Sequence, residues 1–194
     1  MGQVTRIELK TGAFFAVAAA VLLMPLWLFV SLIIAAASHE TCHFLALQFL
    51  GVRVYRISIG PFGASMETEP MELWRELLCA FAGPLGSLIL IPFFRWIPGI
   101  AFCGLIQGTF NMLPIYPMDG GRILKCLLDI LKITMGEKIL KTVELMTVLG
   151  ILFLGLWGKW HWNLGWGGAM IGTVLLLRLI RRNTSCKESR FRVQ

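Results

Sequence analysis

The chain has 194 residues, of which 57% are hydrophobic and only 15% charged, and its net charge is +7. In soluble domains about a quarter of the residues are charged, so these apolar side chains are expected to face lipid rather than to fill the core of a soluble domain. The positive charge gathers beside apolar runs and no recognition module accompanies it, which excludes nucleic acid as the expected partner and favours the lipid bilayer.

The first apolar region, 12–50, is almost uncharged. Since one span needs about 20 residues, the region predicts two short helices with Pro25 as the turning point. A secretory signal that ends at Ala35-Ala36-Ala37 is the alternative, but the apolar region is longer than the usual ~7–15 residues and continues past that point. Residues 52–59 then alternate apolar with polar side chains before a turn at 60–63, which predicts a short β-hairpin at the membrane surface.

Four further spans are expected, the first of them interrupted by Gly83-Pro84; they cover 77–96, 99–113, 139–157 and 164–180. Lysine and arginine concentrate in the N-terminus, in the connections 53–75 and 122–141, and in the tail. The positive-inside rule therefore places both termini in the cytoplasm of a multi-pass protein of the cell membrane.

We therefore expect an all-α polytopic membrane protein with about six transmembrane helices and a short membrane-surface β-hairpin after the second. Residues 1–182 are predicted to form a single domain. Residues 183–194 are predicted to form a basic cytoplasmic tail.

Two of the three histidines fall in the sequence His39-Glu40-Thr41-Cys42-His43, an H-E-x-x-H pattern on a predicted helix. Residues four apart lie on nearly the same helix face, about 5.4 Å apart along the axis, so both imidazoles can bind one metal ion. Glu40 lies beside that face, where its carboxylate could act as a general base. A chance match or a polar helix end is the alternative, but apolar residues flank the motif, and each ionisable group at mid-membrane costs about 2.5–3.5 kcal/mol.

A third ligand is needed if the fourth position of a catalytic zinc is left for water. Asp119 is the candidate, because Pro114 and Pro117 break the preceding span. Broken helices at membrane depth are tolerated where they are buried in protein or line a water-filled cavity, so Asp119 is expected to face the interior. A plain N-cap for a helix that begins near Gly121 explains Asp119 equally well. The residues alone leave these two readings open.

The H-E-x-x-H motif in an early span and the sequence N-x-x-P-x-x-P-x-D-G at 111–120 together resemble the site-2 protease family of intramembrane zinc metalloproteases. Gly83-Pro84 is similar to a Gly-Pro element of that family. The resemblance implies a zinc metalloendopeptidase that cleaves a membrane-associated or transmembrane protein in regulated proteolysis. It also implies that Asp119 is the third zinc ligand beside His39 and His43, and that Asn111 binds the scissile carbonyl or its oxyanion.

Within the family, the small size, short spans and basic tail look most like the sporulation branch, whose members remove the pro-sequence of a sigma factor. A pro-sigma factor is thus the expected substrate, and a membrane-embedded inhibitory partner is a further implication. That branch usually continues into a CBS domain, which the 194 residues do not contain, so regulation by ATP is not carried over. Cys42 stands where the family more often has glycine, and we expect it to pack rather than to act as a rival thiolate ligand.

Two other functions could use the same residues. A membrane transporter or metal carrier also places ionisable groups inside the bilayer, although Glu40 would then have no need to lie beside the histidines. A catalytically inactive regulatory relative is the second alternative, against which the intact motif residues argue. Finally, the predicted strand at 52–59 could offer a free edge to an unwound substrate, or could be a plain loop.

Overall fold

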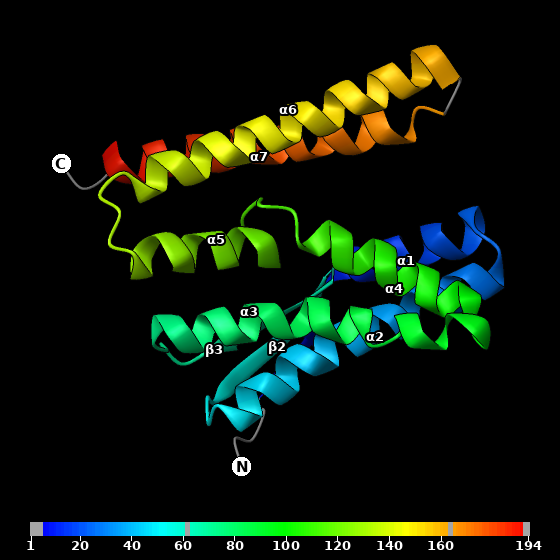
Figure 1. Cartoon of the computed structure of the whole chain (residues 1–194), viewed down its shortest axis with the longest axis horizontal. Coiled ribbons are helices and arrows are strands. Elements are labelled where there is room, and N and C mark those ends of the chain that lie inside the picture. Colours follow the sequence, from blue (N-terminus) through cyan, green and yellow to red (C-terminus); the bar gives the residue numbers. More distant parts are fainter. Residues whose placement is uncertain (1–5, 61–62, 163–164, 192–194) are drawn as a thin grey trace.

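The computed structural model describes residues 6–60, 63–162 and 165–191, and is mainly helical with one small sheet (Figure 1). The helices are α1 (Thr11–Leu23), α2 (Leu26–Phe49), α3 (Leu73–Leu88), the short 3-10 helix η1 (Ile91–Arg95), α4 (Pro98–Asn111), α5 (Asp119–Ile130), α6 (Gly136–Trp162) and α7 (Gly167–Phe191). The strands are β1 (Arg6–Leu9), β2 (Val54–Gly60) and β3 (Gly63–Thr68). The predicted helical class is confirmed, as is the hairpin after the second helix.

Three helical segments are long and apolar enough to cross a membrane, namely Leu26–Phe49, Leu73–Arg95 and Gly136–His161. Two shorter apolar helices, Thr11–Leu23 and Met170–Ile180, accompany them, and the count of six spans stays a prediction. Many large apolar side chains lie on the outer surface, among them Phe15 and Leu22 of α1. A lipid environment removes the cost that water would impose on such a surface.

Proline determines where the first apolar region bends. Pro25 is the N-cap of α2, directly after the C-cap of α1, because it lacks the N–H group that a continuous helix would need. The expected turning point is therefore confirmed. The prediction that Gly83-Pro84 interrupts the next span is wrong, because α3 continues through Pro84 to Leu88. Both residues are buried where α3 packs against neighbouring helices, and this packing offsets the hydrogen bond that Pro84 cannot donate.

The sheet contains a strand that the sequence pattern did not reveal. β1 pairs in parallel with β2, and β3 pairs with β2 on the other side in antiparallel orientation. Ile57 at the centre of β2 lies opposite Ile7 on one side and Met66 on the other. The idea that β2 presents a free edge is therefore wrong, and among the described residues the outer strands are β1 and β3.

The helices pack so that α2, α3, α4 and α5 meet around a common centre. α2 lies against both α3 and α4, and α3 lies against α5. Figure 1 shows α6 and α7 side by side along one side of the molecule, with α5 between this pair and α3. α7 runs on to Phe191, so the helix continues into the predicted tail 183–194, whose last three residues lie outside the described part.

Candidate active site

Four of the five residues singled out from the sequence meet where α2, α4 and α5 approach one another. His39 and His43 lie one turn apart on the buried face of α2, with exposed fractions of 2% and 8%. Asn111 is the last residue of α4, and Asp119 is the first residue of α5. Helix ends thus place an amide and a carboxylate opposite the two imidazoles, although 76 positions separate His43 from Asp119.

The donor atoms of His39, His43 and Asp119 are close enough to share one ion. Asp119 Oδ2 lies 3.1 Å from His39 Nε2 and 3.2 Å from His43 Nε2. Tetrahedral zinc with bonds near 2.05 Å separates its ligand atoms by about 3.3 Å, so these distances suit zinc. Among the described residues, this is the one group of three or more candidate ligand side chains that could hold a metal ion. The donor set of two imidazoles and one carboxylate leaves a fourth position open.

The outer nitrogens of both imidazoles are held by α3. His43 Nδ1 donates to the backbone carbonyl of Cys79 at 2.8 Å, and His39 Nδ1 lies 2.9 Å from the hydroxyl of Ser87. Because a carbonyl only accepts, His43 carries a proton on Nδ1, and its Nε2 lone pair can face a metal. The sequence did not point to these two partners, although Ser87 is a polar residue within a predicted span.

The N-cap explanation for Asp119 does not hold in the structure. The N-cap position of α5 belongs to Met118, and the Asp119 carboxylate points toward the histidines. Burial favours a raised pKa for Asp119, but its interactions with His39 and His43 outweigh burial and lower the pKa below its usual range. The surroundings of Asp119 thus favour the charged carboxylate that a metal ligand needs.

Glu40 and Asn111 lie on the rim of this centre. The Glu40 carboxylate lies beside the start of β3, where it interacts with the backbone of Ala64. A Cβ atom placed on Gly63 would be 3.5 Å from Glu40 Oε1. The side-chain amide of Asn111 lies 3.3 Å from His39 Nε2. A carboxylate and a side-chain amide thus accompany the three candidate ligands, and the first residues of β3 lie next to Glu40.

α3 approaches the two histidines so closely that only glycine fits at one position. A Cβ atom on Gly83 would lie 2.1 Å from His43 Nε2 and 2.7 Å from His39 Nε2. Cys42 is directed elsewhere, since its sulfur would be 2.5 Å from a Cβ atom on Gly86. Cys42 therefore packs against the backbone of α3, and it is not in the group of candidate ligands.

Residues 91–155 match the model of peptidase family M50, a segment that contains Asn111 and Asp119 but not the H-E-x-x-H motif. A zinc metalloprotease of Methanocaldococcus jannaschii is 32% identical over 118 residues, which are 53% of this chain and 34% of that protein. Stage IV sporulation protein FB of Bacillus subtilis is 32% identical over 110 residues, 48% of this chain and 37% of that protein.

The solved structure of a site-2 protease from Methanocaldococcus jannaschii matches the whole architecture. The TM-score is 0.65 at 20% sequence identity, and the match covers 93% of this chain and 92% of the other. The expected fold is therefore confirmed at the level of architecture. The chain spans only about a third of the length of the two relatives named above.

Proposed function

We propose that this chain, of which residues 91–155 match peptidase family M50, is an intramembrane zinc metalloendopeptidase of the site-2 protease type. Its proposed substrate is a membrane-associated or transmembrane protein. The observation that carries this proposal is the convergence of His39, His43 and Asp119 on one point, with the carboxyl group of Glu40 next to it. In this proposal the three residues are the zinc ligands, Glu40 is the general base, and Asn111 binds the oxyanion.

In the proposed reaction, a bound zinc ion supplies the positive charge that acidifies the attacking water and polarises the scissile carbonyl. Glu40 removes a proton from that water as the water oxygen bonds to the carbonyl carbon. The Asn111 amide donates a hydrogen bond to the oxygen that becomes negative in the tetrahedral intermediate. Glu40 then returns the proton to the nitrogen as the C–N bond breaks, so the amine leaves neutral.

The helices around the site support a membrane location for this chemistry. α2 carries both histidines and Glu40 and is one of the segments long enough to cross a bilayer. We propose a multi-pass arrangement with both termini cytoplasmic, because basic residues concentrate in the connections 53–75 and 122–141. The likeness to stage IV sporulation protein FB supports a narrower proposal, in which the substrate is a pro-sigma factor.

The experiment that tests the proposal is cleavage by the purified chain in lipid vesicles, with and without zinc. The substrates are a tagged pro-sigma factor fragment and a set of single-span membrane proteins. We expect a shorter product from at least one substrate. A zinc chelator should abolish this product and added zinc should restore it, because the three ligands alone cannot activate water.

The outcomes of this assay distinguish the proposed protease from the alternative functions. Cleavage of single-span proteins but not of the pro-sigma fragment would overturn the sporulation substrate and leave the protease proposal intact. Bound zinc without cleavage of any substrate would support an inactive regulatory relative. Release of zinc across the vesicle membrane would support a metal carrier.

Removal of the Asn111 amide should slow cleavage without loss of metal. In an Asn111→Ala variant we expect turnover to fall by about 10²–10³, since this is the usual effect of deleting one oxyanion donor. Zinc content should equal that of the parent chain, because Asn111 is outside the three-ligand group. Thr109→Ala, at an exposed position of the same helix, is the control and should have parent activity. Full activity of Asn111→Ala would remove the residue from the mechanism.

A further inference from the structure

A fully buried carboxylate lies in α6, away from the site described above. Glu144 has an exposed fraction of 0% and is the largest fully buried side chain of the described residues. It lies within the apolar segment Gly136–His161, where an ionisable side chain is costly and usually has a function. The proposed reaction makes no use of Glu144, so its place in this helix needs another explanation.

Glu144 is hydrogen-bonded to the loop that joins Asn111 to Asp119. The backbone N–H of Tyr116 donates to Glu144 Oε1 at 2.9 Å. Tyr116 lies in the connection between Asn111, which ends α4, and Asp119, which begins α5. Pro114 and Pro117 have no N–H to donate, and the N–H groups of Met112, Leu113, Ile115 and Met118 donate to nearby backbone carbonyls. The N–H of Tyr116 is the one in this connection that a side chain accepts.

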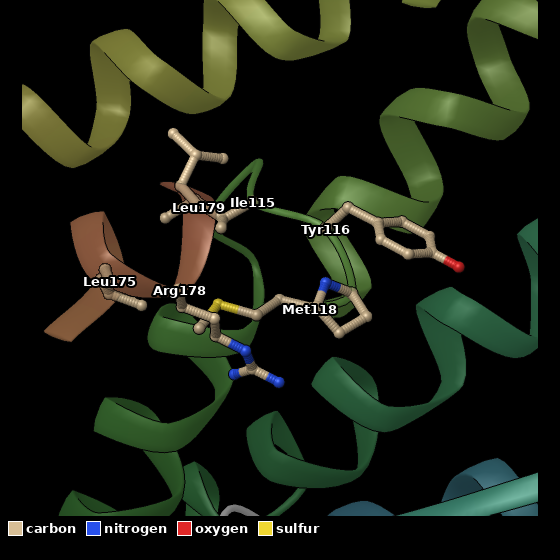
Figure 2. A pocket seen from close by; sticks show the side chains of 7 residues that line it. Ile115, Tyr116, Met118, Leu175, Arg178 and Leu179 are labelled. Carbon is tan, nitrogen blue, oxygen red and sulfur yellow. The ribbon is translucent and has the colours of Figure 1, made fainter. Parts of the chain in front are cut away.

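The same face of α6 also holds the loop by apolar contact. Ile115 packs in one buried cluster with Val148 of α6 and Leu175 of α7. Val148 is four residues from Glu144, so the two side chains lie one turn apart on one helix face. Figure 2 shows Ile115 and Met118 of the loop beside Leu175, Arg178 and Leu179 of α7, whereas the ring of Tyr116 points away from α7. The loop therefore lies against the α6–α7 pair.

On its other side, the loop is in close contact with the start of α5. A Cβ atom on Gly121 would lie 2.4 Å from the backbone nitrogen of Tyr116, and one on Gly120 would lie 2.0 Å from the carbonyl oxygen of Met112. These two glycines directly follow Asp119 in the sequence. Because no side chain separates the two backbones, a displacement of Tyr116 must displace the first turn of α5.

We propose that Glu144 is a positioning residue for Asp119. Its carboxylate fixes Tyr116, Tyr116 is packed on Gly121, and Gly121 belongs to the helical turn that begins with Asp119. The bond thereby keeps Asp119 Oδ2 at the 3.1 and 3.2 Å separations from the histidines that suit one metal ion. Glu144 is not in the group of candidate ligands. The inference rests on the proposed function for the identity of the metal, and its test measures metal binding instead of cleavage.

The test compares two substitutions of nearly equal volume in the purified full chain. Glu144→Met fills the space but cannot accept a hydrogen bond, whereas Glu144→Gln keeps an acceptor oxygen for the Tyr116 N–H. Metal affinity is measured by titration with Co²⁺, whose visible absorption reports ligand geometry, and by competition with Zn²⁺. We expect Glu144→Met to weaken metal affinity by about 10-fold, the lower end of the effect of losing a hydrogen bond to a metal ligand, because Glu144 acts on Asp119 through Tyr116; the Co²⁺ spectrum should also change. Glu144→Gln should restore both.

Leu140→Ala is the matched control. Leu140 is buried on α6 one turn before Glu144 and is outside the cluster that contains Ile115. This variant should lower the thermal unfolding temperature but retain parent metal affinity and spectrum. If Glu144→Met does not fold, Glu144→Ala takes its place in the same comparison.

The outcomes separate this inference from the proposed function. A parent chain that binds Co²⁺ together with a Glu144→Met variant of equal affinity and spectrum would overturn the positioning role alone. An equal loss of affinity in Leu140→Ala would also overturn it, because general destabilisation of α6 would then be the cause. A parent chain that binds neither Co²⁺ nor Zn²⁺ would overturn the proposed function, and the positioning role with it.

Discussion

A Glu40→Gln variant should bind zinc like the parent chain and cleave its substrate about 10²–10⁴ times more slowly, which is the usual contribution of a general base. Glutamine has nearly the same size and keeps an oxygen that can accept from the backbone of Ala64, so the start of β3 should stay in place. It cannot take a proton from water, so only the chemical step is affected. The measurement is turnover in vesicles, together with zinc content per chain.

Cys42→Ala provides the control for this experiment. Cys42 is two residues from Glu40 on the same helix, and its sulfur faces Gly86 instead of the candidate ligands. We expect parent turnover and parent zinc content in this variant. Full activity of Glu40→Gln would show that another group accepts the proton, and loss of zinc from Cys42→Ala would make the thiolate a ligand.

The parts of the site that depend on local spacing could be predicted from the sequence. His39, Glu40 and His43 lie within five residues of one helix, so helical geometry alone places both imidazoles on one face. Asp119 was different, because an N-cap role and a ligand role are equally compatible with its local sequence. The structure distinguishes them by the direction of the carboxylate, which depends on the contact of α5 with α3 and α2.

The groups that hold the candidate ligands in place from behind could not be predicted, because they are backbone atoms or residues distant in the sequence. The Cys79 carbonyl that orients His43 is the same chemical group at every residue type, so no sequence pattern marks it. Glu144 is separated by 28 residues from the Tyr116 N–H that it accepts. β1 was missed for a similar reason: four residues carry too short an alternation, and a parallel partner far along the chain stabilises them.

The continuity of α3 through Pro84 also depends on contacts with residues distant in the sequence. Proline removes one helical hydrogen bond, and the local rule therefore predicts a break. The adjacent Gly83 lets α3 lie directly against the imidazoles of α2, and the packing that results keeps the helix continuous. Tertiary contacts thus override a local preference at the point where the candidate ligands need space.

A Gly83→Ala variant should lose metal affinity and activity together. Alanine favours a helix more than glycine does, so the substitution puts no strain on the backbone of α3. Its Cβ atom would lie 2.1 Å from His43 Nε2, so α3 or the imidazole must move. Misplacement by about 1 Å can cost about 10²-fold in rate, and we expect at least that loss, with clearly weaker Zn²⁺ binding. Isothermal titration and the cleavage assay measure the two effects.

Gly86→Ala is the matched control, because its Cβ atom would meet Cys42 Sγ at 2.5 Å between the same two helices. Overpacking of this kind costs about 1–3 kcal/mol of folding free energy, and we expect similar destabilisation in both variants. Zinc affinity should fall in Gly83→Ala alone, because only that methyl group meets the nitrogens of the candidate ligands His39 and His43. An equal fall in both variants would mean that separation of α2 from α3 suffices to disrupt the site. In that case glycine at position 83 would serve helix packing in general and not the space that the metal ligands occupy.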